Sequence, residues 1–76
     1  MNQQENRQQL GKRIKVRRTE MDMNQGELAA KVGMKQSQFS LVERGLLGVS
    51  VDQLRAIANA LNCTGAYLLG EEKKAA

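Results

Sequence analysis

The sequence predicts an all-α domain, a compact bundle of five short helices built from one chain of 76 residues. Three observations favour helices over a sheet. Proline is absent, apolar residues recur at spacings of three and four, and capping residues precede several of these segments. A chain of this length forms one core, so residues 1–76 are expected to be a single domain with an ordered part at about 7–70.

The first helix is predicted over about residues 7–21. Leu10, Ile14, the stem of Arg17 and Met21 fall at spacings of three or four, which places them on one side of a helix. The polar residues before this segment contain no hydrophobic stretch of the kind found in signal peptides. We therefore expect the stripe to face the core and the preceding residues to fray.

The second helix is predicted to follow Asn24. Asparagine is a favoured N-cap residue, and Glu27 stands three positions later, as in a capping box. Gly33 is expected to end the helix, because glycine adopts a left-handed backbone most easily. The residues expected on its inner face are Leu28, Ala29 and Val32.

The third helix is predicted to begin at Lys35 or Gln36 and to end at Gly45. Phe39 and Val42 are three positions apart and are expected to point toward the core. The opposite side of this helix is then polar and carries short side chains. Its outward residues are expected to be Gln36, Ser37, Ser40 and Leu41.

Two further helices are predicted in the last third of the chain. Ser50 and Gln53 form a second capping-box pair, and Asn62 is predicted to be a left-handed residue after the helix that follows them. Thr64 is predicted to cap a short last helix that Gly70 ends. The apolar stripe of the fourth helix is expected to be Leu54, Ile57, Ala58 and Leu61.

Positive charge is concentrated in the first part of the chain. The net charge is +4, and residues 7–44 hold nine basic and four acidic residues, whereas residues 45–76 hold three of each. A basic surface of this kind suits a partner that carries phosphates.

The residue types argue against an enzyme or a metal protein. The chain has no histidine and one cysteine, Cys63, so no disulfide, metal or cofactor is expected. Cys63 is interpreted as a small apolar core residue, with a reactive thiol as the alternative. No apolar run approaches the ~20 residues of a membrane helix. We therefore expect no contact with a membrane and a cytoplasmic location.

The central motif is QGELAAKVGMKQSQFSLVERG at residues 25–45, two predicted helices joined by a tight turn at Gly33. Together with LGKRIKVRR at 10–18, LRAIANALNC at 54–63 and YLLG at 67–70, it resembles the helix-turn-helix domains of lambdoid phage repressors, Cro proteins and related small bacterial regulators. The resemblance covers about residues 10–70. It implies a lambda-repressor-like fold in which the second and third helices form the helix-turn-helix.

The resemblance also implies which residues read DNA bases. Gln36, Ser37 and Leu41 match the family positions on the recognition helix that contact base edges. Gln36 can pair with adenine, and Leu41 can pack on a thymine methyl group, the alternative being a surface leucine without a role. Lys35 stands where the family often has a capping Ser or Thr, so it is predicted to reach a phosphate or a guanine instead.

Phosphate contacts are implied at the start of the second helix and around the third. Gln25 matches the family's phosphate-binding glutamine, helped by the positive end of the helix. Asn24 either adds a second contact or acts only as a cap. Arg44 is predicted to lie near phosphates that flank the recognition helix, and Arg13 and Arg17 are possible backbone contacts.

Two more features follow from the resemblance. Arg18 and Glu43 match a family pair that bridges the first and third helices, and Arg18 is also predicted to face a DNA phosphate. Leu46 and Leu47, in a loop after the third helix, either pack beneath that loop or contact a second subunit. The short last helix with Tyr67 and Leu69 is a further candidate for the dimer interface.

These implications define the predicted function. We expect a phage or prophage repressor of the Cro-like kind in the cytoplasm of a bacterial host cell. It would be a homodimer that binds near-palindromic operator DNA and regulates transcription, by blocking RNA polymerase or by contacting it. The alternatives are a protein-interaction or antitoxin-type helix-turn-helix module and a restriction-modification controller protein.

Overall fold

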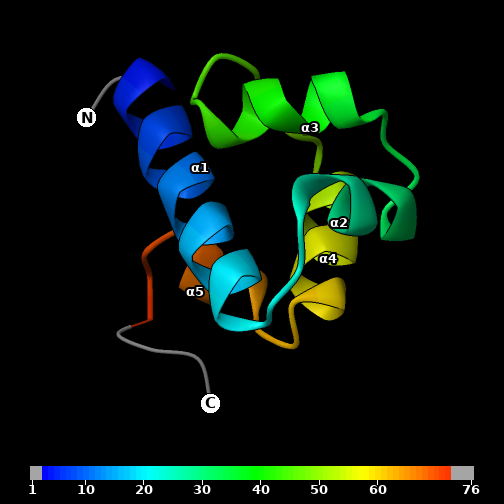
Figure 1. Cartoon of the computed structure of the whole chain (residues 1–76). Helices are drawn as coiled ribbons and strands as arrows, with labels where there is room; N and C mark the ends of the chain where they lie inside the picture. The colour runs from blue at the N-terminus through cyan, green and yellow to red at the C-terminus, as the bar shows by residue number, and fades with distance from the viewer. Residues whose placement is uncertain (1–2, 73–76) are drawn as a thin grey trace.

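Five helices follow one another in the computed structural model, which describes residues 3–72. They are α1 (Gln3–Glu20), α2 (Gln25–Lys31), α3 (Gln36–Glu43), α4 (Val51–Ala60) and α5 (Gly65–Leu68), and these residues contain no strand. In Figure 1, α1 runs along one side of the molecule, α3 lies at the top with one end beside the N-terminal part of α1, and α2 and α4 lie on the opposite side. The predicted all-α bundle is confirmed.

The helix α1 begins four residues before the predicted start at Arg7. Gln4 Nε2 donates a hydrogen bond to the Gly45 carbonyl over 3.4 Å, and Gly45 packs directly against Gln8. This contact with the end of α3 holds the first turns of α1 in place. The first helix therefore extends further toward the N-terminus than predicted, and residues 1–2 and 73–76 lie outside the described chain.

Both predicted capping boxes are present. Asn24 Oδ1 accepts from the Glu27 amide over 2.8 Å, and Glu27 Oε1 accepts from the Asn24 amide over 2.9 Å. The corresponding distances between Ser50 and Gln53 are 3.1 and 2.9 Å. Each box satisfies amide groups that the first turn of a helix leaves without a partner.

The predicted helix ends are also present. Gly33 and Asn62 adopt left-handed backbones with φ values of 71° and 54°. Thr64 caps α5, its hydroxyl accepting from the Tyr67 amide over 2.9 Å. These residues turn the chain between α2 and α3 and between α4 and α5.

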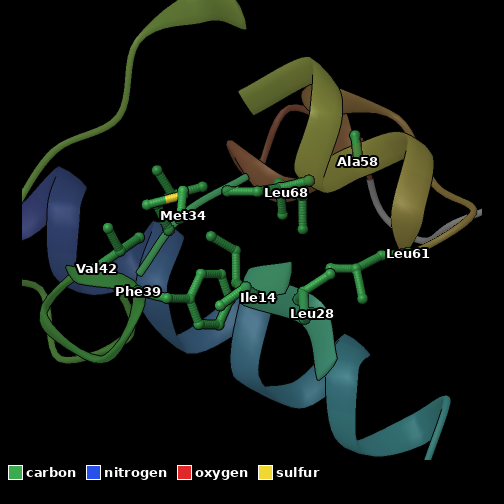
Figure 2. Packing of buried hydrophobic residues seen from close by; sticks show 11 residues of the cluster. Ile14, Leu28, Met34, Phe39, Val42, Ala58, Leu61 and Leu68 are labelled. Atoms are coloured by element: carbon green, nitrogen blue, oxygen red, sulfur yellow. The ribbon is translucent and has the colours of Figure 1, made fainter. Parts of the chain in front are cut away.

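One apolar core joins all five helices. Figure 2 shows side chains from each helix pointing into a common space around Phe39 and Ile14. The inward residues predicted for α1 to α4 belong to this core or pack against it, whereas the burial of Met34 and Leu68 was not predicted. The buried residues are Leu10, Ile14, Leu28, Ala29, Met34, Phe39, Val42, Ile57, Ala58, Leu61 and Leu68.

The position of α3 depends on a glycine in the middle of α1. A Cβ added at Gly11 would lie 2.4 Å from the Val42 carbonyl oxygen and 2.5 Å from that of Glu43. Gly11 therefore allows the backbone of α1 to touch the C-terminal end of α3 directly. The crossing fixes where α3 sits on the core and leaves its other side exposed.

Candidate nucleic-acid interface

The solvent side of α3 carries the residues predicted to read bases. Gln36, Ser37 and Leu41 are exposed, and Leu41 keeps 36% of its surface accessible. Phe39 and Val42 are buried beneath them and anchor the helix to the core. The predicted helical phase is therefore correct, and α3 presents a short, mostly polar face.

Lys35 is the residue immediately before α3. It occupies the N-cap position with an extended backbone and makes no side-chain capping bond, so the helix begins at Gln36. Its exposed side chain is therefore not committed to the end of the helix. An ammonium group at this place can reach a nearby anion or an acceptor on a base.

The C-terminal end of α3 is tied to α1 by the predicted ion pair. Arg18 Nε donates to Glu43 Oε2 over 2.7 Å, and Arg18 Nη2 donates to Glu43 Oε1 over 3.1 Å. The side chains are 11% and 2% exposed, respectively. Such a two-pronged pair is directional, so it orients α3 as well as attaching it.

Arg18 is committed to the interior of the protein. Its Nη1 also donates to the Met23 carbonyl over 2.7 Å, so every nitrogen of the guanidinium donates to a protein oxygen. The hydrogen bond from Arg18 to Glu43 raises the pKa of Arg18 above its ordinary value. These bonds leave no nitrogen of the guanidinium without a protein partner, so they give no support to the predicted contact with a DNA phosphate. Arg18 instead holds α3 in position.

Gln25 extends the pair to α2. Its Nε2 donates to Glu43 Oε1 over 2.9 Å, so one carboxylate oxygen receives hydrogen bonds from both α1 and α2. An amide nitrogen carries two hydrogens, which leaves one for an outside acceptor. Gln25 is half-buried, and the neighbouring Asn24 is exposed with its oxygen used by the cap.

The remaining arginines divide between two parts of the surface. Arg44 is exposed at the C-terminal end of α3. Arg13 instead lies against Gly70, and its Nη1 donates to Gln9 over 3.4 Å. Residues 11 and 13 are about 200° apart around a helix, so Arg13 points away from the side of α1 that touches α3.

Arg17 also makes its hydrogen bonds away from the exposed face of α3. Its Nε donates to the Leu61 carbonyl over 2.9 Å, and its Nη2 donates to the Asn62 carbonyl over 3.3 Å. These oxygens belong to the C-terminal end of α4. The structure therefore does not bring Arg13 and Arg17 together with the exposed face of α3.

The residues predicted for the dimer interface differ in their exposure to solvent. Leu47 and Tyr67 are partly buried against the core. Leu46 remains 53% exposed. Val51 and Leu69 are also exposed apolar residues, and of these two sequence reasoning missed Val51. They border a groove of about 380 Å³ that is lined by Asn6, Arg7, Leu10, Gly48, Val49, Ser50, Val51, Leu54 and Leu69.

Residues 3–72 contain no group of three or more His, Cys, Asp or Glu side chains that could hold a metal ion. Cys63 is partly buried against the core, and burial raises the pKa of its thiol. None of the described helices is long and apolar enough to span a membrane.

Two of the contacts that hold α3 could not be predicted. The Met23 carbonyl is a backbone group, and every residue type carries one. The bond from Gln25 to Glu43 joins positions 18 residues apart that the motif assigns to separate roles. Gly11 did carry a signal, because a glycine inside a helical pattern indicates close packing.

Comparison with known proteins gives consistent matches. A family model described as helix-turn-helix matches residues 14–68. The immunity repressor protein of Bacillus phage phi105 is 35% identical over 63 residues, which cover 83% of this chain and 44% of that protein. The chain thus spans less than half the length of this relative.

Solved structures match over most of the chain. The P22 c2 repressor, solved in complex with a synthetic operator, superposes with a TM-score of 0.78 and 32% identity, covering 83% of this chain and 96% of the repressor. The clp gene regulator ClgR from Corynebacterium glutamicum gives 0.82 and 29%, covering 86% and 69%. The hypothetical transcription factor NHTF from Neisseria gives 0.81 and 26%, covering 91% and 79%.

Proposed function

The chain belongs to the helix-turn-helix family, and on this premise we propose that it binds specific double-stranded DNA and regulates transcription in the bacterial cytoplasm. The observation that carries the proposal is the exposed face of α3, with Gln36, Ser37 and Leu41 on a helix oriented by buried polar bonds. A helix of this width fits a major groove about 12 Å wide.

Base reading is assigned to the first turns of α3. Gln36 has the donor and acceptor that recognise adenine, and Ser37 can donate to or accept from several bases. Leu41 lies one turn further along the same exposed side and offers an apolar contact to a thymine methyl group. Lys35 adds a positive charge at the start of the helix.

Phosphate binding is assigned to the ends of α2 and α3. Gln25 and Asn24 each retain amide hydrogens at the start of α2, and Arg44 is exposed at the end of α3. Contacts of this kind position a protein on DNA without reading its sequence. Binding should therefore weaken steeply as salt concentration rises.

We further propose that two copies of the chain bind a near-palindromic operator. Val51 and Leu69 are exposed apolar side chains that border one groove, a surface that a second copy could cover, and Leu46 is a further exposed apolar residue outside α3. Two recognition helices on adjacent turns of DNA require half-sites about 34–36 Å apart. A dimer at such a site would exclude RNA polymerase from an overlapping promoter.

The test is selection from a pool of random double-stranded DNA by the purified protein, followed by sequencing. The expected result is a palindromic consensus with one fixed half-site spacing. Sedimentation of the complex then gives the number of chains for each duplex. Enrichment of no sequence, at a salt concentration where the protein stays folded, would refute the proposal and favour the protein-interaction alternative.

A further inference from the structure

The carboxamide of Gln36 lies over a glycine in the first turn of α2. A Cβ added at Gly26 would stand 3.2 Å from Gln36 Oε1, 3.4 Å from Asn24 Oδ1 and 3.7 Å from Gln36 Cδ. The first distance is shorter than an ordinary van der Waals contact. The side chain of Gln36 therefore occupies space that any residue larger than glycine would invade.

The backbone does not require glycine at this position. Gly26 is the second residue of α2, and it is not among the described glycines with positive φ, which are Gly33, Gly45 and Gly70. Its nearest neighbours are side-chain atoms, whereas those of Gly11 are backbone atoms. Glycine is less favourable than alanine inside a helix, so local stability does not explain it either.

The contact restricts a side chain that is otherwise unrestrained. Within residues 3–72 the Gln36 carboxamide makes no hydrogen bond, and the residue is exposed. A free glutamine samples many rotamers, and each rotamer aims its donor and acceptor differently. In the structure the amide oxygen is the Gln36 atom nearest to the Cβ position of Gly26, so it turns toward α2.

We propose that Gly26 is a specificity-determining residue. Because Gly26 has no side chain, the Gln36 carboxamide can occupy the space above it, and this placement sets the direction in which Gln36 meets a base. The inference rests on the proposed function, since Gln36 must read DNA for Gly26 to act through it. Gly26 is thus a positioning residue and touches no base itself.

The test compares Gly26→Ala, Gln36→Ala and the double variant on the selected operator and on duplexes changed at each position. Gly26→Ala should fold with an unchanged or higher melting temperature, since Gln36 is exposed and can move. Its preference at the one base pair that Gln36 reads should change about tenfold, comparable to loss of much of a good base contact. In the Gln36→Ala background the same substitution should change nothing.

A matched glycine controls for general effects on a helix. A Cβ at Gly65, the first residue of α5, would make ordinary contacts of 3.5 and 3.6 Å with the Leu54 side chain. Gly65→Ala should therefore leave the base preference intact.

In the wild-type protein without DNA, a nuclear Overhauser effect should join the Gly26 Hα atoms to the Gln36 side-chain amide hydrogens. The Gly26→Ala variant should lose the corresponding signal, because the added methyl group displaces the carboxamide.

The outcomes separate the inference from the proposed function. If Gln36→Ala changes one base preference and Gly26→Ala does not, the inference is overturned while the proposed function stands. An even loss of affinity for all sequences in Gly26→Ala would also overturn it. If the wild-type protein selects no sequence, the proposed function fails and the inference fails with it.

Discussion

Arg17 and Arg18 are neighbours near the end of α1, yet they hold two different halves of the molecule. Arg18 reaches the buried carboxylate of Glu43 on α3 and the Met23 carbonyl before α2. Arg17 reaches the carbonyls of Leu61 and Asn62 at the end of α4. One helix therefore anchors the α2–α3 half by a charged side-chain pair and the α4–α5 half through backbone oxygens.

The two halves also differ in what fixes their geometry. In the α2–α3 half, bonds from Arg18 and Gln25 converge on one buried carboxylate, and such bonds depend strongly on direction. Both halves bury apolar side chains completely, Phe39 in one and Ile57 and Leu61 in the other, and such burial is much less directional. Among the described residues of the α4–α5 half, no buried ion pair adds to it. We infer that the orientation of α3, which carries the proposed DNA-reading face, is fixed more strictly than the orientation of α4 and α5.

Replacing Arg18 should have the largest effect on the free energy of unfolding. Arg18→Met should lower the free energy of unfolding by about 3–5 kcal/mol, because it leaves the Glu43 charge buried without its main partner. Urea denaturation measures the change. Arg18→Met combined with Glu43→Met should recover much of the loss, since replacing a whole buried pair by apolar residues is often neutral. A loss below about 1 kcal/mol in the single variant would mean that the pair behaves as a solvated one.

The matched change on the other half should have a smaller effect. Arg17→Met removes two hydrogen bonds from a charged donor to carbonyls, but this side chain is more exposed than that of Arg18. We expect a loss of about 1–2 kcal/mol in the same urea experiment. The base preference of the folded variant should be unchanged. A changed preference would show that the end of α4 also orients α3.

Local features of the fold could be predicted from the sequence, and long-range polar contacts could not. Asn24 with Glu27 and Ser50 with Gln53 act over three residues, so the capping partners are visible in the sequence itself. By contrast, Arg17 and Leu61 are 44 residues apart, and the acceptor is a backbone oxygen. Nothing in the residue types distinguishes that carbonyl from any other.

The candidate site was predicted to a similar extent. The outward positions on α3 followed from helical periodicity, because the buried Phe39 and Val42 fix its phase. The partners of the basic residues did not follow. A long arginine side chain can turn to either side of a helix, and the neighbouring elements that attract Arg13 and Arg18 are known only once the chain has folded.

Removing either N-cap side chain should have a smaller effect on the free energy of unfolding than replacing Arg18. Asn24→Ala and Ser50→Ala should each lower the free energy of unfolding by about 1 kcal/mol, since each removes one N-cap acceptor. Only Asn24 lies beside the proposed phosphate contact. Asn24→Ala should therefore also weaken DNA binding evenly across sequences, as loss of a backbone contact does. Titration of labelled duplexes measures this, and an unchanged affinity would make Asn24 a cap alone.

The smallest expected effects come from two exposed leucines, one in each half. Leu41 and Leu69 are 36% and 49% exposed, so changing either to alanine should alter the free energy of unfolding by no more than about 0.5 kcal/mol. Leu41→Ala should reduce the preference for thymine at one base pair by about 1 kcal/mol, because it removes methyl groups that pack on the base. Leu69→Ala should leave every base preference intact and weaken only the association of two chains, measured by sedimentation. If Leu41→Ala weakened the association of two chains instead, the exposed face of α3 would be a protein contact. The assignment of DNA reading to the α2–α3 half would then be wrong.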